Sequence, residues 1–247
     1  MCMKKIFSLL IIITILIIFL SGCTKQVTVS SAVLLAHYKF EENLSDATGN
    51  YGEGKVCGNK LGVSGGNITY TTGIDGKAVY LDGSSGIQLP DNLISTYQYS
   101  ISLWLNAEAL SYFTPVFFGV VKKDITNEWL SIIPGGHPLY NPQNQIAVWS
   151  NYNNGQGWYD GKTGYTLEIG KWYHIAVTVN NGNIKIYING EKKFDNIGFP
   201  DLFTGKDTIF ALGVNYWDTP FKGAIDDLRI YNGVLTDSEV LSLATKR

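Results

Sequence analysis

The sequence predicts an all-β chain, folded as a two-sheet antiparallel sandwich with one short helix at its C-terminal end. Many short segments alternate β-branched or aromatic residues with polar ones, which is the period of a half-buried strand. Turn residues separate these segments at close spacing, as in sandwiches and jelly rolls. No helical periodicity longer than two turns occurs before residue 236. A chain of 247 residues is long enough for one large sandwich.

The clearest element is a hairpin at residues 170–190, GKWYHIAVTVNNGNIKIYING. Two runs with period-two alternation flank Asn181-Gly182, and both of these residues tolerate the positive φ of a type I′ turn. A hairpin alone is marginally stable in water, so its apolar face needs a second layer. We therefore expect this hairpin near the centre of a sheet that packs on another sheet, with Ile175 and Ile186 in the core.

The remaining strands follow from the same pattern. We expect strands at residues 34–40, 77–81, 87–89, 99–105, 116–121, 129–133, 145–150, 208–213 and 221–231. Residues 41–60 are rich in Gly, Asn and Asp and predict a loop. Near the end, Thr236 and Glu239 form a capping-box pattern ahead of an apolar stretch, which predicts the short helix.

The first 22 residues have the organisation of a secretory signal peptide. Lys4 and Lys5 precede an apolar run at residues 6–20, which is short for a membrane span. The segment that follows, Leu20-Ser21-Gly22-Cys23, resembles the lipobox of bacterial lipoproteins. This resemblance implies cleavage before Cys23, a lipid on its sulfur, and a short polar tether over residues 23–31. An uncleaved N-terminal anchor is the alternative.

Composition excludes one class of partner and constrains the cysteines. Charged residues make up 16% of the chain, the net charge is −2, and no Lys/Arg cluster is present, so nucleic-acid binding is not expected. Cys2 would leave with the signal peptide and Cys23 would carry lipid. Only Cys57 would remain, and a single thiol cannot form an intramolecular disulfide. We expect it to be a partly buried, unreactive thiol.

Four stretches in order resemble the bacterial LamG-like jelly-roll domain (laminin G type 3), a member of the concanavalin A-like lectin/glucanase fold. They are YKFEEN with its following loop, GIDGKA leading to LDG and IQLP, WYHIA with YING, and FKGAIDDLRIY. The resemblance covers residues 34–244 and implies one jelly-roll domain over residues 32–247. It also implies a structural Ca²⁺ where the first and last strands meet, with Glu41, Asn43 and Asp226 as ligands. The alternative is that these acids are ordinary strand-edge residues.

Catalysis is not expected. Glycoside hydrolases of this fold resemble one another in carrying Glu-x-Asp-x-x-Glu on a strand, because two carboxylates must flank the scissile bond. In this chain the only acidic pair two residues apart is Asp237 and Glu239, in the predicted helix. Neither a G-x-S-x-G nucleophile motif nor metal-ligand spacing of the three histidines occurs. The sequence therefore predicts that the chain is not an enzyme.

Aromatic residues predict a carbohydrate-binding cleft. Trp129, Trp149, Trp158 and Trp217 lie at predicted strand ends or in loops, whereas Trp104 and Trp172 fit core positions. Tyr152 and Tyr159 add aromatic rings to the segment WSNYNNGQGWYD, which is also rich in amides. Sugars stack on aromatic rings while amides and carboxylates bond their hydroxyls. Alternatively, these rings only cover the undersides of loops.

The sequence thus predicts a non-catalytic, lipid-anchored, carbohydrate-binding module of the cell envelope. Its partners would be a glycan or cell-envelope polysaccharide and, through Cys23, the membrane on its extracytoplasmic side. A protein–protein adhesion or assembly module and a glycoside hydrolase with an unrecognised site are the alternatives. The identity of the glycan, the oligomeric state and the choice between inner and outer membrane stay open.

Overall fold

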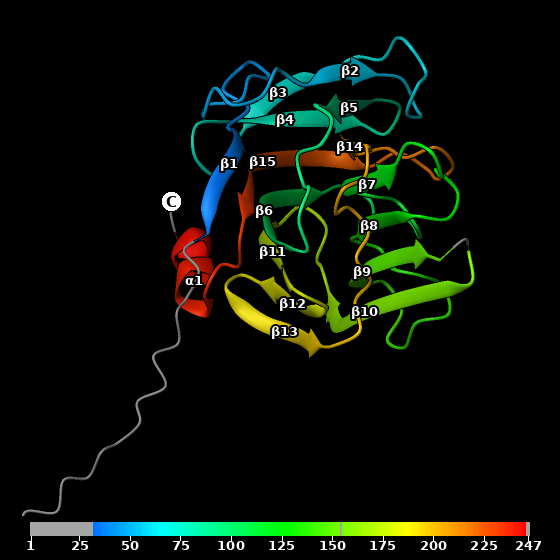
Figure 1. Ribbon diagram of the computed structural model, residues 1–247. Helices are drawn as coiled ribbons and strands as arrows, with labels where there is room; N and C mark the ends of the chain where they lie inside the picture. Colours follow the sequence, from blue (N-terminus) through cyan, green and yellow to red (C-terminus); the bar gives the residue numbers. More distant parts are fainter. Residues whose placement is uncertain (1–31, 154, 246–247) are drawn as a thin grey trace, which may run out of the picture.

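A computed structural model describes residues 32–153 and 155–245, which fold as two facing antiparallel sheets with one helix at the side (Figure 1). The strands are β1 (Val33–Tyr38), β2 (Lys55–Cys57), β3 (Thr69–Thr72), β4 (Lys77–Asp82), β5 (Gly86–Leu89), β6 (Gln98–Ala107), β7 (Phe117–Val121), β8 (Trp129–Ile133), β9 (Gln145–Tyr152), β10 (Gly157–Thr166), β11 (Trp172–Asn180), β12 (Asn183–Ile188), β13 (Glu191–Asn196), β14 (Thr208–Leu212) and β15 (Lys222–Asn232); helix α1 spans Asp237–Thr245. The predicted all-β sandwich with a short C-terminal helix is confirmed.

The eight-stranded sheet has the order β13-β12-β11-β6-β15-β4-β3, with β1 pairing to β15 off this path. The seven-stranded sheet has the order β10-β9-β8-β7-β14-β5-β2. Strands from both ends of the chain are therefore neighbours, because β1 lies antiparallel beside β15. This closes the domain, since its first strand is held by its last.

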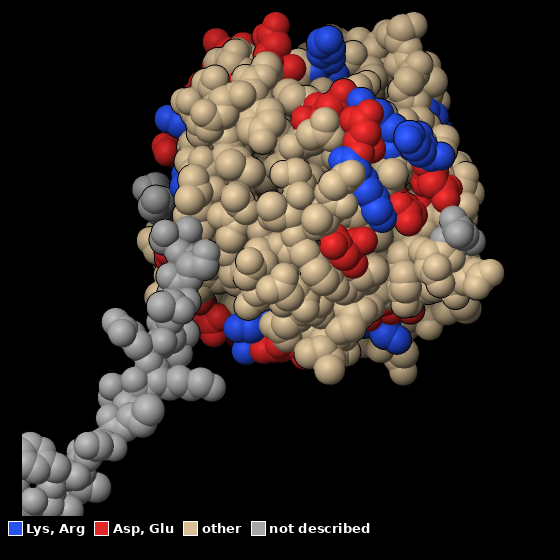
Figure 2. All heavy atoms as spheres, in the orientation of Figure 1, with Lys and Arg blue, Asp and Glu red and all other residues tan. Residues whose placement is uncertain are grey.

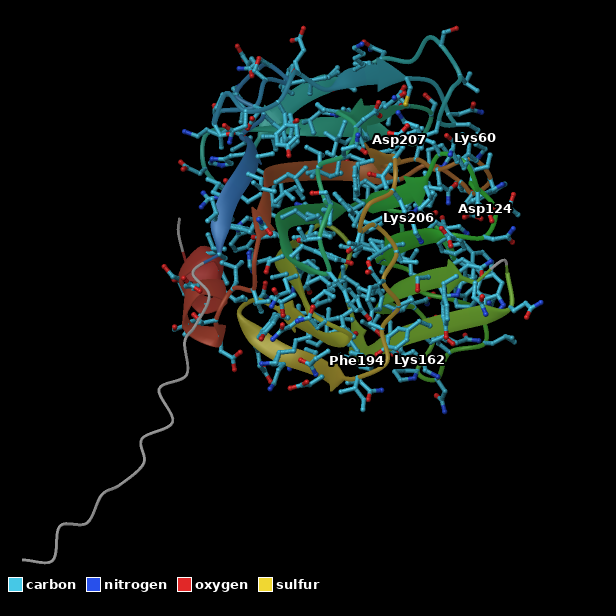
Figure 3. All side chains as sticks on the ribbon, in the orientation of Figure 1. Lys60, Asp124, Lys162, Phe194, Lys206 and Asp207 are labelled. Carbon is cyan, nitrogen blue, oxygen red and sulfur yellow. The ribbon has the colours of Figure 1, made fainter. Side chains whose placement is uncertain are left out.

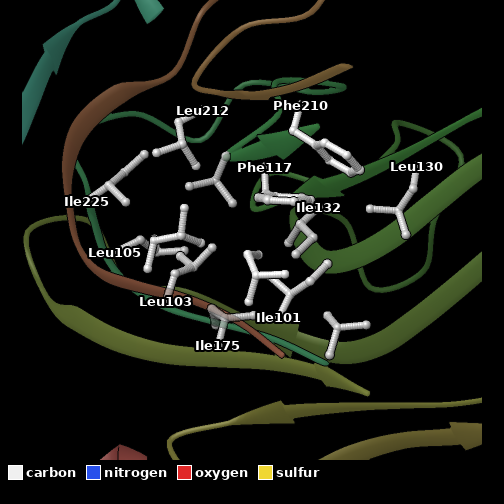
Figure 4. Packing of buried hydrophobic residues seen from close by; sticks show 14 of the residues in the cluster. Ile101, Leu103, Leu105, Phe117, Leu130, Ile132, Ile175, Phe210, Leu212 and Ile225 are labelled. Atoms are coloured by element: carbon white, nitrogen blue, oxygen red, sulfur yellow. The ribbon is translucent and has the colours of Figure 1, made fainter. Parts of the chain in front are cut away.

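One apolar core fills the space between the sheets. On β6, Ile101, Leu103 and Leu105 are fully buried and point inwards, while the residues between them point outwards. From the facing sheet, Phe117 and Phe210 pack against these residues (Figure 4). The ring centroids of Phe117 and Phe210 lie 5.9 Å apart. Each strand thus commits one face to the core and leaves the other for solvent, loops or ligands.

The central hairpin is confirmed. Asn180 pairs with Asn183, and the two turn residues Asn181 and Gly182 have φ values of +47° and +90°, as a type I′ turn requires. Ile175 and Ile186 are 1% and 0% exposed. Strand β11 also pairs with β6, and β12 pairs with β13, so the hairpin lies inside the eight-stranded sheet.

Four strands were not anticipated. Strand β2 lies within the predicted loop at residues 41–60, and β3, β10 and β13 carry threonine, glycine or charged residues in place of an apolar alternation. All four are edge strands, because β13 and β3 end the eight-stranded sheet and β10 and β2 end the seven-stranded sheet. Because edge strands bury little side-chain surface, their sequences need no strong apolar pattern.

Helix α1 begins with the predicted capping box. Thr236 Oγ1 accepts the Glu239 N–H at 3.2 Å, and the Glu239 carboxylate accepts the Thr236 N–H at 2.7 Å. Val240 and Leu243 are buried against Tyr187 of β12 on the outer face of the eight-stranded sheet. The helix therefore seals part of that face.

The signal peptide, Cys23 and the tether, assigned from residues 1–31, lie outside the described residues. Within the part of the chain that the structure describes, no helix is both long and apolar enough to cross a membrane. Cys57 is buried, and this burial raises the pKa of its thiol.

His174 is a buried titratable group on the outer face of the eight-stranded sheet. It is 0% exposed, its Nε2 lies 2.8 Å from Ser102 Oγ, and its ring lies 5.3 Å from that of Trp104. Burial lowers the pKa of His174 to about 4; Asp227 opposes this shift and Arg229 adds to it. The ring therefore stays neutral in the folded protein at pH values where it would be protonated in the unfolded chain.

This shift predicts a pH dependence of stability. Above the unfolded pKa of about 6.5, the His174 ring is neutral in both states and costs no stability. As the pH falls from about 6.5 towards the folded pKa of about 4, the unfolded chain binds a proton that the folded protein does not, so the free energy of unfolding decreases. Between pH 7 and pH 4, we expect the wild type to lose about 3 kcal/mol more than His174→Gln, at roughly 1.4 kcal/mol per pKa unit. Urea unfolding of both proteins at the two pH values measures this. Parallel pH profiles would contradict it.

Candidate functional site

Residues 149–152 belong to β9 and residues 157–160 to β10, so paired strands carry the aromatic residues of this segment. Trp158 pairs with Asn151, and Asp160 pairs with Trp149, so the two tryptophans are diagonal neighbours on one face. Their rings stack, with centroids 5.2 Å apart and an interplanar angle of 13°. Trp158 is 53% exposed and rests on Trp149, which is half-buried. The outer face of the seven-stranded sheet therefore presents a supported, solvent-facing indole.

Trp129 of β8 lies beneath this pair. It is 4% exposed, and its Nε1 donates to the Thr126 carbonyl at 3.0 Å. Its ring centroid lies 4.8 Å from that of Trp149 and 5.9 Å from those of both Trp158 and Trp217. Trp129 is thus the base of the cluster, and the surface that a ligand can reach comes from its neighbours.

Trp217 extends the cluster on the side away from β10. It is 43% exposed in the loop between β14 and β15, where its backbone N–H donates to Asn215 Oδ1 at 2.9 Å. Lys60 Nζ donates to the Asp218 carbonyl of the same loop. Figure 3 labels Lys60 near this loop and Lys162 on β10.

A pocket of about 460 Å³ opens beside the stacked pair. It is lined by Trp149, Trp158, His137, Leu139, Tyr140, Asp160 and Lys162. The Tyr140 hydroxyl donates to Asp160 Oδ1 at 2.5 Å, and Lys162 Nζ lies 5.4 Å from the centre of the Tyr140 ring. Burial, with a further contribution from Asp160, raises the pKa of Tyr140 well above its usual value, so its hydroxyl remains a donor.

This lining combines flat aromatic surface with a few polar groups. Such pockets bind polyhydroxylated ligands, because C–H faces stack on indoles while carboxylate, ammonium and imidazole groups bond hydroxyls. Of the described residues that line it, Asp160 is the only carboxylate. Glycoside hydrolysis uses two flanking carboxylates, so this pocket offers binding without the usual hydrolytic pair.

Tyr152 and Tyr159 do not join the tryptophans. Along β9 and β10 they occupy the alternate positions and pack against the core between the sheets. Tyr159 stands 5.1 Å from Phe199, ring to ring, in an edge-on arrangement. Tyr152 and Tyr159, predicted as binding residues, therefore face away from Trp149 and Trp158, because a strand sends neighbouring residues to opposite faces.

The pocket residues that the sequence does not indicate include His137, Tyr140 and Lys162. The first two come from the proline-containing segment between β8 and β9, which has no strand periodicity. Lys162 shares the outer face of β10 with Trp158 and Asp160 at intervals of two residues, a pattern visible once β10 is assigned as a strand.

The expected calcium ligands are brought together only in part. Asp226 is 1% exposed; its Oδ2 accepts the Ile74 N–H at 2.8 Å, and its Oδ1 accepts the Asp227 N–H at 2.7 Å. The Glu41 carboxylate accepts the Lys77 N–H at 3.1 and 3.2 Å. Both carboxylates therefore bind one short loop, residues 73–77, from the two ends of the chain.

Asn43 turns away from this loop. Its Oδ1 accepts the Ser45 N–H at 3.0 Å and its Nδ2 donates to the Glu41 carbonyl at 2.7 Å. Burial raises the pKa of Asp226 to about 6, although hydrogen bonds from the backbone N–H groups of Ile74, Asp75 and Asp227 oppose this shift. Among the residues described, no group of three or more His, Cys, Asp or Glu side chains is arranged to hold a metal. Glu41 and Asp226 thus bind backbone N–H groups of the same loop, and Asn43 does not.

Known proteins with a similar sequence or structure share this two-sheet fold. Residues 81–241 match the family described as the concanavalin A-like lectin/glucanases superfamily. Domain 4 of AbnA, a GH43 extracellular arabinanase from Geobacillus stearothermophilus, solved in complex with arabinotriose, is 49% identical, with a TM-score of 0.80 over 87% of this chain and 99% of that one. No curated protein matches the chain.

Two further structures share the fold. The binding domain of Paraclostridial Mosquitocidal Protein 1 is 20% identical, with a TM-score of 0.58, and the Botulinum Neurotoxin Type G receptor binding domain is 19% identical, with a TM-score of 0.55. Both matches cover 86% of this chain and about half of the matched chain. From the matched family and the close structural relative, the chain belongs to the concanavalin A-like lectin/glucanase superfamily.

Proposed function

We propose that this chain is a non-catalytic module that binds arabinose-containing oligosaccharides on the outer face of its seven-stranded sheet. The observation that carries the proposal is the stacked pair of Trp149 and exposed Trp158 beside a polar pocket. The 49% identical relative supports the class of sugar, because it was solved with arabinotriose.

The charges around the pocket favour a neutral ligand. Asp160 and Lys162 both line it, so the opposite charges balance locally. On the face shown in Figure 2, acidic and basic side chains are intermingled and most of the surface is uncharged. A polyanion or a strongly charged peptide would meet no net charge from Asp160 and Lys162 at the pocket, whereas a sugar needs only stacking surface and dispersed hydrogen-bonding groups.

Trp158 is the residue whose loss should matter most. We expect Trp158→Ala to weaken arabinotriose binding by about tenfold or more, because an exposed indole on a rigid support is a typical binding hot spot. Trp158→Phe, which keeps a ring, should retain most of the affinity. Isothermal titration calorimetry measures the arabinotriose affinity of the wild type and of both variants.

Ile197→Ala is the matched control, since Ile197 is 74% exposed and lies outside the pocket. It should bind as the wild type does. If Trp158→Ala binds arabinotriose with wild-type affinity, the pocket is not the site. If no variant and no wild-type protein binds any arabinose oligosaccharide, an adhesion role for the same surface becomes the better account.

Calcium remains a prediction that rests on Glu41 and Asp226. If the ion binds the folded state only, saturating Ca²⁺ at about 100 times its Kd should raise the melting temperature by about 5 °C or more relative to EDTA. Glu41→Gln should abolish this difference, because it removes one anionic ligand. Equal melting temperatures in calcium and EDTA would rule out a structural ion.

The lipid anchor also remains a proposal, supported by the lipobox-like Leu20-Ser21-Gly22-Cys23. Expressed in a bacterial host, the full chain should partition into the detergent phase and the membrane fraction, and Cys23→Ala should lose its lipid as judged by mass spectrometry. A mature N-terminus at Cys23 carrying diacylglycerol supports the anchor. An intact signal segment on unmodified Cys23 would favour the uncleaved alternative.

A further inference from the structure

A second row of polar and aromatic side chains crosses the outer face of the eight-stranded sheet. The strand register places Thr69 opposite Tyr80, Tyr80 opposite Ala224, Ala224 opposite Asn106, and Asn106 opposite Trp172. Directly paired residues lie on the same face of a sheet, so these five side chains form one line across β3, β4, β15, β6 and β11. The adjoining residues of β4 and β6, including Val79 and Leu105, are buried in the core.

This line forms a groove of about 450 Å³. Tyr80 and Trp172 are its walls, three strand spacings or about 14 Å apart. Ala224 and Asn106 lie between them, and the small alanine side chain leaves the floor low. The next row towards α1 is filled by buried Trp104, Asp226 and His174, which bounds the groove on that side.

The chemistry of the groove suits neutral, hydroxyl-bearing ligands. It is lined by Thr69, Thr71, Thr72, Tyr70, Tyr80, Asn106, Glu108, Gly170, Trp172 and Ala224. Its one acid, Glu108, accepts the Tyr80 hydroxyl at 2.9 Å and lies 3.4 Å from Lys222 Nζ, so its charge is countered. Hydroxyls, an amide and one half-buried indole remain to meet a ligand, which is the combination that recognises sugars.

We propose that this groove is a second carbohydrate-binding site, which makes the module bivalent. The class of sugar rests on the proposed function, whereas the choice of groove residues rests on the strand register and the groove lining alone. The groove lies on the outer face of one sheet and the Trp158 pocket on the outer face of the other, so two glycan chains can be held on opposite sides of one domain. Such a module links chains as well as binding them.

The groove should be the weaker site. It offers one indole, Trp172, whereas the Trp158 pocket offers an exposed indole stacked on another. A calorimetric titration with arabinotriose would therefore be dominated by the Trp158 pocket, and the groove needs a residue-resolved measurement.

The test is a two-dimensional NMR titration with arabinotriose of four full-domain proteins: wild type, Trp158→Ala, Thr69→Arg and the double variant. In the wild type, saturable shift changes should occur at Asn106 and Trp172 as well as at Trp158. In Trp158→Ala, the groove signals should still move. Thr69→Arg places a long side chain in the groove from an exposed edge position, so it should weaken the groove response about tenfold without disturbing the core.

The two proposals fail differently. Shift changes confined to the Trp158 pocket would overturn the second site and leave the proposed function intact. Changes confined to the groove would support the groove and overturn the pocket. Signals that stay fixed in both places would overturn both proposals. Loss of the groove response in Trp158→Ala would overturn the independence of the groove from Trp158.

Discussion

The packing of two apolar sheet faces against each other determines everything else in this domain. Because side chains alternate along a strand, burying Ile101, Leu103 and Leu105 in the core sends Ser102, Trp104 and Asn106 to the outside. An outer face is then a regular array of side chains whose spacing is fixed by the backbone. Large aromatic residues are unusual on such a face, because a sheet face in contact with solvent is normally polar.

The structure supplies two different reasons. On the eight-stranded sheet, Trp104 is buried, because it packs beside the His174 ring, 5.3 Å away, and pairs with buried Asp226 of the neighbouring strand. On the seven-stranded sheet, Trp158 remains half in solvent although Trp129 and Trp149 lie under it. A rigid aromatic platform loses little conformational entropy on binding a ligand, so an exposed indole with two indoles in support is better suited to binding than an indole on a flexible loop.

Much of the fold could be predicted from the sequence, since strong alternation marks buried strands. Ile175 and Ile186 fell in the core as expected, and Asn181-Gly182 formed the expected turn. The site was predicted less well. Asn and Gly residues in segment 149–160 concealed a hairpin, so Tyr152 and Tyr159 were grouped with the tryptophans although strand geometry sends them to the core side. Tyr140 could not be identified, because only the folded chain brings it to Asp160.

The stacking surface for a sugar is the Trp158 indole on the outer face of the seven-stranded sheet, and polar groups of β10 and of the β8–β9 segment lie beside it. A crystal structure of the domain with arabinotriose tests it most directly. We expect a sugar ring lying on the Trp158 indole, with hydroxyls reaching Asp160 or Lys162. Sugar density bound at the end loops, with the Trp158 indole left bare, would contradict it.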